Sequence, residues 1–288
     1  MKNYLLIILL ALLSNLAYSD AYLDSQLKLA EQGDADAQFG LGNMYTYGLG
    51  VPENDKTAVM WYTKAAEQEH AKAQFFLGNR YADGRGVPEN DKTAVMWYTK
   101  AAEQGDADAQ FNLGNMYDRG EGIQQDYKTA VMWFTKAAEQ EHAKAQFNLG
   151  NMYADGRGVP ENDKTAVMWF TKAAEQGRGE AQFNLGNMYK RGEGVQQDYK
   201  TAVMWLTKAA EQGRVDAQFN LGNMYAKGEG VPENDIKAYV WWSMAKVNGN
   251  KGAKNNIEIF KKKMTKEQIA KAQELAAKCY ESDYKHCD

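Results

Sequence analysis

The sequence repeats itself every 36 residues, and this regularity constrains the fold more than any other feature. An Ala-Gln pair recurs without insertion or deletion at residues 37/38, 73/74, 109/110, 145/146, 181/182 and 217/218. The octapeptide QFNLGNMY stands letter for letter at 110–117, 146–153, 182–189 and 218–225. A fixed period of this length is typical of tandem repeats, in which a unit too small to bury its own apolar face stacks on its neighbours. We therefore expect six stacked units between Ala37 and Gly252.

Each unit begins with an amphipathic helical pattern. In the first unit, one helical face collects small, apolar and amide side chains, namely Ala37, Gln38, Leu41, Gly42 and Tyr45. Glycine inside a helix costs about 1 kcal/mol relative to alanine, so a glycine here indicates the close approach of another helix. We expect Gln38 to hydrogen-bond a backbone group between units, because a polar side chain on a core face needs a partner.

A second helical pattern follows a glycine-rich turn. Gly48 and Gly50 are expected to end the first helix, and Asn54 is placed to cap the next one. The apolar stripe of that second helix is Ala58, Trp61, Tyr62, Ala65 and Ala66. Val59 and Met60 beside the stripe are apolar as well. We therefore expect neighbouring units to cover the helix on more than one side.

The complete unit reads A-x-A-Q-x-x-L-G-x-M-Y, then G-x-G-V, then A-x-x-W-x-x-x-A-A-x-Q-G. This pattern resembles the Sel-one-like repeat family, which is related to the tetratricopeptide repeats. The resemblance covers residues 37–252 and implies an all-α fold, a right-handed α/α superhelical solenoid of six 36-residue helix-hairpin repeats with terminal caps. It also implies a protein-interaction scaffold, although a fold does not fix the partner. Some cysteine-rich relatives are linked to penicillin binding and β-lactam hydrolysis, but none of the six units here contains a cysteine.

The two ends of the chain differ from the repeats. Residues 1–19 combine a positive Lys2, an apolar run and a small-x-small end, so we expect a cleavable signal peptide and a periplasmic or secreted protein. An uncleaved N-terminal anchor is the alternative. Residues 20–36 resemble the second helix of an incomplete unit and are expected to form an N-terminal capping half-repeat. Residues 253–288 are expected to form C-terminal capping helices, the last of them starting at a capping box.

The chain has two cysteines, Cys279 and Cys287. In an oxidising compartment we expect one disulfide between them that ties down the chain end; two free thiols are the cytosolic alternative. His286 beside them gives too few ligands for a metal site. We therefore expect no metal and no cofactor.

Two asparagines recur on the side of the first helix that faces away from its core stripe. If the first helices line the concave wall of the solenoid, they form a ladder of Asn43, Asn79, Asn115, Asn151, Asn187 and Asn223, with a second set at Asn112, Asn148, Asn184 and Asn220. A side-chain amide has two donors and an acceptor, so it can pair with an extended peptide backbone. In the alternative, these asparagines bond neighbouring loops or face water.

Charged residues that differ between near-identical units follow the repeated tyrosine. We expect five of them to line the rim of the same groove and to set partner choice or register: Arg119, Asp155, Lys190, Arg191 and Lys227. An ordinary solvated surface is the equally economical alternative.

Signals for an enzyme are weak. A Ser-x-x-Lys spacing occurs at Ser25/Lys28, Ser243/Lys246 and Ser282/Lys285, without the Ser-Asp-Asn and Lys-Thr-Gly motifs of penicillin-interacting enzymes. We expect no catalytic residues. The net charge of −4 comes without a run of like charge, which argues against a nucleic-acid partner, and no stable membrane insertion is expected after leader cleavage. The sequence therefore predicts a scaffold that binds a protein or peptide on its concave face, with a β-lactam hydrolase and an envelope-organising structural protein as alternatives.

Overall fold

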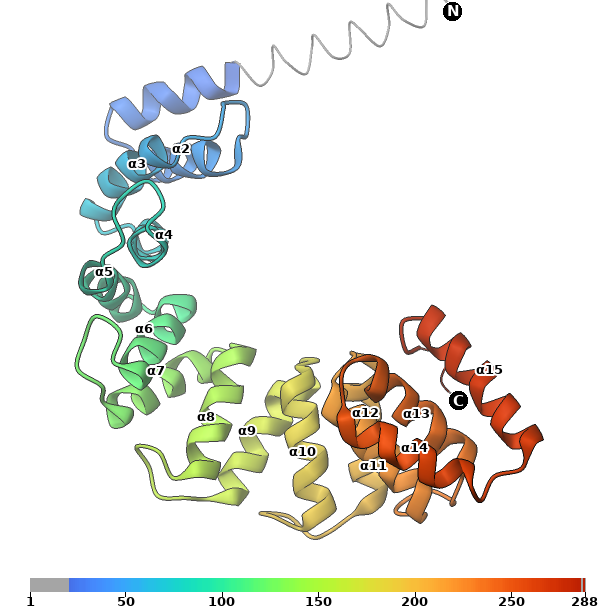
Figure 1. Ribbon diagram of the computed structural model, residues 1–288. Coiled ribbons are helices and arrows are strands. Elements are labelled where there is room, and N and C mark those ends of the chain that lie inside the picture. The colour runs from blue at the N-terminus through green and yellow to red at the C-terminus, as the bar shows by residue number, and fades with distance from the viewer. Residues whose placement is uncertain (1–20, 286, 288) are drawn as a thin grey trace, which may run out of the picture. The chain divides into compact units, whose positions relative to one another are not determined.

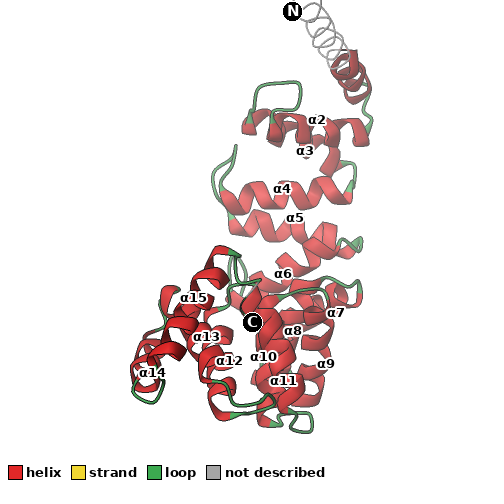
Figure 2. Cartoon of the chain, turned by 90° about the vertical axis from the view of Figure 1, so that its right-hand side faces the viewer, coloured by secondary structure: helices red, strands yellow, loops and turns green. Residues whose placement is uncertain are grey.

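The computed structural model describes residues 21–285 and residue 287, so the expected signal peptide and His286 lie outside the described residues. Within that range all regular secondary structure is helical, as Figure 2 shows. The chain forms two compact units, one ending at Gln140 and the other beginning at Glu141. No helix in the described range combines the length and the apolar character needed to cross a membrane.

Unit 1 contains a helix over residues 21–31 and three hairpins, each made of a first helix and a second helix (Figure 1). The hairpins are α2 (Ala35–Tyr47) with α3 (Asp55–Glu67), α4 (Ala71–Asp83) with α5 (Asp91–Glu103), and α6 (Ala107–Arg119) with α7 (Tyr127–Glu139). Within the series α2 to α7, each pair of consecutive helices packs together. This is the packing expected of a solenoid of helix hairpins.

Unit 2 repeats the arrangement with three further hairpins and two terminal helices. The hairpins are α8 (Ala143–Asp155) with α9 (Asp163–Glu175), α10 (Gly179–Arg191) with α11 (Tyr199–Glu211), and α12 (Val215–Lys227) with α13 (Asp235–Val247). The terminal helices are α14 (Lys251–Lys261) and α15 (Lys266–Glu281), and both pack against α13. The predicted all-α fold of six helix-hairpin repeats is therefore confirmed.

Local sequence sets the ends of these helices. Asn54 Oδ1 accepts a hydrogen bond from the backbone N–H of Thr57 at 3.0 Å, which confirms the predicted cap of α3. Gly48 ends α2 with a φ of 66°, in the left-handed region that favours glycine. After α3 and α7, Glu69 and Glu141 hold φ values of 63° and 62°. The other repeats place a left-handed glycine there, so these two glutamates carry some backbone strain.

The core of each repeat depends on a glycine in the first helix. In α6, Leu113 is fully buried and the neighbouring Gly114 lies against the ring of Phe134 from α7. A Cβ atom on Gly114 would lie 2.7 Å from the ring Cδ1, closer than real Cβ atoms come to their neighbours. The absent side chain is therefore what lets the two helices of a hairpin approach, as the sequence predicted.

The core faces differ from the sequence expectation at two positions. In α2, Met44 is buried and Tyr45 is only half-buried, so the core stripe runs slightly differently round the helix. In α3, the prediction that neighbours cover both flanking residues is confirmed for Val59 and wrong for Met60, whose exposed fraction is 44%. Adjoining helices cover only the valine side. The equivalent methionines Met96, Met132, Met168 and Met204 are exposed in the same way.

The repeated glutamine joins consecutive repeats, as expected. In unit 1, Gln74 Nε2 donates to the backbone oxygen of Ala66 at 3.0 Å. Gln104 Nε2 then donates to Gln74 Oε1 at 2.7 Å. The buried amide thus satisfies a carbonyl near the end of the preceding second helix and is itself satisfied by the next one.

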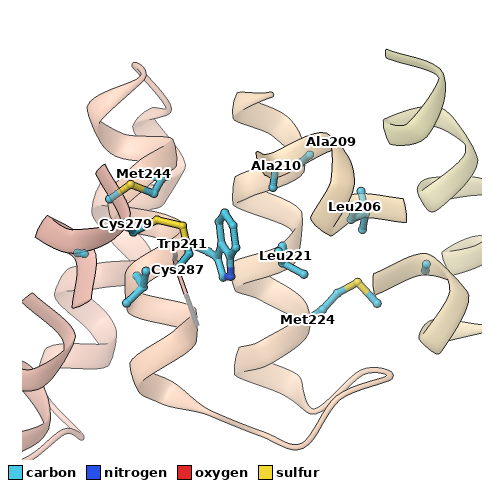
Figure 3. Packing of buried hydrophobic residues seen from close by; sticks show 13 residues of the cluster. Leu206, Ala209, Ala210, Leu221, Met224, Trp241, Met244, Cys279 and Cys287 are labelled. Carbon is cyan, nitrogen blue, oxygen red and sulfur yellow. A yellow bond between two sulfur atoms is a disulfide. The ribbon is translucent and has the colours of Figure 1, made fainter. Parts of the chain in front are cut away.

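The C-terminal cap closes the end of unit 2. The predicted capping box of α15 is confirmed, with Gln268 Oε1 accepting from the Thr265 N–H at 2.8 Å and Thr265 Oγ1 accepting from the Gln268 N–H at 3.2 Å. Cys279 and Cys287 form a disulfide that lies in one buried cluster with Trp241 (Figure 3). The bridge fixes the chain end against the last repeat.

Candidate functional site

The candidate site lies on the solvent side of the first helices, which we call the first-helix face and define by the repeated asparagines. The helical period produces this face directly. In α6, Leu113 and Gly114 point into the core, while Asn112 and Asn115 are half-buried at the surface. The same division holds in α10, where Leu185 is buried and Asn184 and Asn187 are half-buried.

The asparagines of unit 1 are linked to each other and to the second helices. Tyr98 of α5 donates its hydroxyl hydrogen bond to Asn79 Oδ1 at 2.6 Å. Asn112 Nδ2 from the next first helix donates to the same Oδ1 atom at 3.2 Å. In the preceding repeat, the Tyr62 hydroxyl donates to Asn43 Oδ1 at 2.8 Å. Asn43 and Asn79 of the main ladder are thus positioned through their carbonyl oxygens.

Unit 2 contains the same links. The Nδ2 atom of the second asparagine donates to the main-ladder Oδ1 of the repeat before it, at 3.2 Å for Asn184 to Asn151, 2.9 Å for Asn220 to Asn187 and 3.0 Å for Asn256 to Asn223. These side-chain amides hydrogen-bond to each other between consecutive first helices, and not only to loops or solvent. Within the described residues, the Nδ2 groups of Asn79, Asn151 and Asn187 donate no hydrogen bond.

Two cavities open on the first-helix face, one inside each unit. The unit 1 cavity, of about 320 Å³, lies between α4, α5 and α6, and the unit 2 cavity, of about 490 Å³, lies between α8, α9 and α10. They are lined by equivalent residues two repeats apart: Asn79 and Asn151, Asp83 and Asp155, Asp91 and Asp163, Asn115 and Asn187, Arg119 and Arg191, Glu121 and Glu193. The two cavities are therefore copies of one site.

The cavities bring together many, but not all, of the residues that the sequence marked as partner-binding. The unit 1 cavity is lined by Asn79, Asn112, Asn115 and Arg119, and the unit 2 cavity by Asn151, Asp155, Asn184, Asn187 and Arg191. Neither cavity is lined by Asn43, Asn148, Asn220, Asn223, Lys190 or Lys227. The two lysines lie near one carboxylate instead, with their Nζ atoms 3.9 and 3.8 Å from oxygens of Glu229.

The rim charges form short-range pairs within the chain. Arg119 lies 3.5 Å from Glu121, and Arg191 lies 3.5 Å from Glu193 at the equivalent place. Both pairs are largely exposed to solvent. Exposed pairs of this kind contribute at most about 1 kcal/mol, so a partner's charged group can exchange with either member at small cost.

Sequence reasoning missed the aspartates that begin two of the second helices. Asp91 and Asp163 line the cavities although they stand far from the asparagines in their own repeats. A signal was present, because the loop reads PEND before α5 and α9 but QQDY before α7 and α11, which begin with Tyr127 and Tyr199. Its meaning depends on the stacking, which brings the start of one second helix against the next first helix.

The electrostatics of the unit 1 cavity keep Tyr98 protonated. Burial raises the pKa of the Tyr98 hydroxyl well above its ordinary value, and the hydrogen bond with Asn112 acts against this. The nearby carboxylates of Asp83 and Asp91 raise the pKa further, because a second negative charge beside them is unfavourable. The hydroxyl therefore remains a donor to Asn79 at neutral pH.

The Ser-x-x-Lys serines of the C-terminal part are engaged in their own helices. Ser243 Oγ donates to the Tyr239 carbonyl oxygen at 2.8 Å, and Ser282 Oγ donates to the Cys279 carbonyl oxygen at 3.0 Å. Such i to i−4 and i to i−3 bonds are ordinary for serine in or at the end of a helix. Within the described range, no group of three or more His, Cys, Asp or Glu side chains is placed to hold a metal ion.

Comparison with protein families assigns the repeats. The family model described as Sel1 repeat matches residues 35–70, 71–106, 107–142, 143–177, 179–213 and 215–250. This phase starts with the first residue of each first helix. The chain belongs to the Sel1 repeat family, whose members are in general non-catalytic scaffolds for protein–protein interaction. No curated protein sequence matches the chain.

Two solved structures of the family are similar to this chain. A Sel1 repeat protein from Oxalobacter formigenes is 36% identical with a TM-score of 0.67, and the match covers 80% of this chain and 94% of that one. A protective antigen present in uropathogenic Escherichia coli strains, which displays an SLR fold, is 33% identical with a TM-score of 0.62. That match covers 91% of this chain but only 64% of the antigen.

Proposed function

We propose that this protein is a periplasmic or secreted scaffold that binds an extended segment of a partner protein on its first-helix face. The observation that carries the proposal is the pair of equivalent cavities, which are lined by the same asparagines in two separate units of the chain. The cavities offer equivalent polar groups at a fixed spacing of two repeats, as a face that binds along an extended segment requires.

The asparagines supply the contacts that an extended segment needs. Their Oδ1 atoms accept bonds within the protein, which holds the side chains in place before a partner arrives. The Nδ2 groups of Asn79, Asn151 and Asn187 can then donate to the backbone carbonyl oxygens of the partner, whatever its side chains are. Preorganised donors bind at a smaller entropic cost than mobile ones.

The rim residues are proposed to set the register of the partner. Arg119 and Arg191 stand at the edges of the two cavities, and Lys190 and Lys227 lie farther along unit 2 near Glu229. Complementary charge along a groove orients a partner more than it strengthens binding. Exchanging Lys190 and Arg191 for the Ala-Asp pair of the neighbouring repeat is expected to weaken partner binding. Equal binding would assign these residues to the solvated surface.

The proposed location rests on the leader-like residues 1–19 and on the C-terminal disulfide. A disulfide between Cys279 and Cys287 persists in an oxidising compartment and is rare in the cytosol. N-terminal sequencing of the mature protein from a native preparation tests this part, with a start near Asp20 as the expected result. A chain that retains Met1 and remains in the cytosol would contradict it.

Affinity capture tests the binding proposal. The mature chain, residues 20–288, is used as bait for proteins of the native envelope and medium, beside a variant with Asn115, Asn151, Asn187 and Asn223 changed to Ala. The matched control replaces the exposed Met96, Met132, Met168 and Met204 of the second helices by Ala. All three must show equal helicity by circular dichroism.

We expect a partner that the native chain and the methionine control retain and that the asparagine variant loses. Equal retention by all three would contradict the proposed face. Capture of no partner, together with sustained turnover of a chromogenic β-lactam that Ser243→Ala abolishes, would replace the scaffold by an enzyme.

A further inference from the structure

One repeat carries an arginine where the others carry methionine. Arg80 of α4 stands at the position of Met116 in α6 and Met188 in α10, and like them it is buried. Its Nη1 atom lies 2.6 Å from Asp55 Oδ1 at the start of α3. Its Nη2 atom donates to Thr46 Oγ1 of α2 at 2.7 Å. The chain has therefore built a buried guanidinium site at the junction of its first two repeats.

The site has the three parts that a guanidinium needs. Asp55 provides the charge, Thr46 provides a second acceptor, and the Tyr62 ring lies with its centroid 5.9 Å from the Arg80 Cζ atom. A planar group with forked donors can satisfy two acceptors and stack on an aromatic ring together, which an ammonium group cannot.

Two parts of this site, the carboxylate and the aromatic ring, recur in the two cavities without the arginine. Asp91 and Asp163 are the counterparts of Asp55, and each lines its cavity. Tyr98 and Phe170 are the counterparts of the Tyr62 ring and line the cavities as well. At the place of Arg80 the chain has the shorter and uncharged Met116 and Met188, which also line the cavities. The cavity thus occupies the space that the guanidinium fills in the first junction.

The residues around the aspartate are basic in the first junction and acidic in the two cavities. Asp55 is matched by two cations, because Arg85 Nη2 also lies 3.2 Å from its Oδ1 atom. Glu121 and Glu193 stand at the positions equivalent to Arg85 and line the two cavities. Asp83 and Asp155, next to the alanines that replace Thr46, add a further carboxylate to each cavity. Both cavities are therefore acidic in spite of one rim arginine each.

In the junction between the last repeat and the C-terminal cap, the equivalent aspartate is also paired with a cation. Asp235, the fourth aspartate of this series, lies 2.7 Å from Lys263 Nζ, which follows α14 in the C-terminal cap. The aspartates of the first and last junctions are thus matched by cations of this chain. In the described part of the chain, no lysine or arginine forms an ion pair with Asp91 or Asp163.

We propose that each cavity binds the guanidinium group of an arginine side chain from the partner segment. The inference rests on the proposed function, because the same segment lies along the asparagines beside the cavities. Arg80 shows the bound arrangement: one carboxylate at the start of a second helix, one further acceptor, and an aromatic ring beside the guanidinium carbon. The ladder holds the partner backbone, and the cavities select arginine.

A peptide titration tests the inference. The probe is N-acetyl-Gly-Arg-Gly-amide, compared with the same peptide containing citrulline, which keeps the shape and loses the charge. Binding is followed at low ionic strength by the NMR signals of the asparagine side-chain amides in isotope-labelled mature protein. We expect saturable shifts at the cavity asparagines with the arginine peptide, and binding of the citrulline peptide weaker by at least about tenfold, because hydrogen bonds to a charged group are lost.

Variants copied from the chain itself locate the site. Met116→Arg and Met188→Arg place in each cavity the side chain that Arg80 supplies in the first junction, so each is expected to abolish the shifts in its own unit only. Asp91→Asn is expected to do the same in unit 1 without adding volume. Arg80→Met combined with Arg85→Glu, which copies the residues of the cavities at both positions, is expected to create a third site that responds to the arginine peptide.

Equal binding of the citrulline peptide, or shifts that persist in the Met116→Arg, Met188→Arg double variant, would overturn the inference. So would the absence of any shift with the arginine peptide. If capture of a partner still depends on the asparagines in that case, the proposed function stands and only the arginine pocket is rejected. The two proposals are thus tested separately.

Discussion

The junction between the first and second repeats and the junction between the second and third share one core and differ in their polar layer. In both, a fully buried leucine, Leu77 or Leu113, stands beside a glycine that lies against an aromatic ring of its own hairpin. In the polar layer, Arg80 fills the first junction and pairs with Asp55, whereas the second junction retains a cavity beside Asp91. A few side chains on a constant framework therefore decide whether the chain itself fills a junction or leaves a cavity there.

The comparison separates the residues that near-identical repeats share from those in which they differ. The residues that repeat without change build the helices and the core, and so they set where the first-helix face lies. The residues that vary, such as Met116 for Arg80 and Glu121 for Arg85, change the volume and the charge of the junction. In a repeat array of this kind, we expect functional residues at positions that vary between repeats as well as at positions that do not vary.

Substitution of the buried leucines is expected to reduce stability the most, and by the same amount in both junctions. Leu77→Ala and Leu113→Ala each remove a fully buried side chain and leave a void in the core. Each is expected to lower the free energy of unfolding by about 3 kcal/mol, the middle of the range for such substitutions. Urea denaturation followed by circular dichroism measures both. A large loss for one leucine and almost none for the other would show that the two cores are not equivalent.

Substitution of the aspartate at the start of the second helix is expected to reduce stability by different amounts in the two junctions. Asp55→Asn removes the carboxylate that faces the buried guanidinium of Arg80, and we expect it to cost about 2 kcal/mol of stability. Asp91→Asn is the matched variant, at the same first position of the next second helix. It is expected to cost less than about 0.5 kcal/mol, because no lysine or arginine in the described part of the chain forms an ion pair with Asp91. Equal costs would remove the distinction between a filled and an open junction.

Tyr98→Phe is expected to have a smaller effect that depends on pH. The variant copies Phe170 of the other cavity and loses one hydrogen bond to Asn79, at a cost of about 1 kcal/mol near neutral pH. Burial raises the pKa of Tyr98 in the folded state, so the unfolded state releases its proton first. Its contribution is complete below about pH 10, the ordinary tyrosine value, and declines as the pH rises beyond it.

Unfolding curves of both proteins at neutral pH and above about pH 10 check this sign. The native protein should lose more stability than Tyr98→Phe over that interval. A greater loss by the variant would contradict the assigned burial.

Substitution of an exposed methionine on a second helix is expected to change stability the least. Met132 of α7 has an exposed fraction of 44% and lies on a second helix, so Met132→Ala should change stability by no more than about 0.5 kcal/mol. Partner capture by this variant should equal that of the native chain. A loss of capture would place binding on the second helices and away from the cavities.

Much of the fold could be predicted from the sequence, because periodic features determine it. The 36-residue spacing, the caps at Asn54 and its equivalents, the helix-ending Gly48 and the core glycines all act within one repeat or between identical repeats. Met60 was predicted to be covered and is exposed, because periodicity marks a residue as apolar but does not show how far the next helix extends over it.

The candidate site could be predicted only in part. The asparagines were marked by their recurrence on the outer side of the first helix. Asp91 and Asp163 were not, because they belong to the second helix and reach the first-helix face only through stacking. Arg80 was visible as a departure from the repeat, but its significance depends on its distance to Asp55 across two repeats. Such pairings between repeats are invisible in the spacing of a single unit.

Site-specific photo-cross-linking shows whether the partner lies on the first-helix face. A photoreactive phenylalanine analogue is placed at Arg119, at the edge of the unit 1 cavity, and in a second protein at Met132 on the second-helix side. Both proteins are irradiated with the captured partner. We predict a covalent adduct from position 119 and none from position 132. An adduct from position 132 alone would contradict the account.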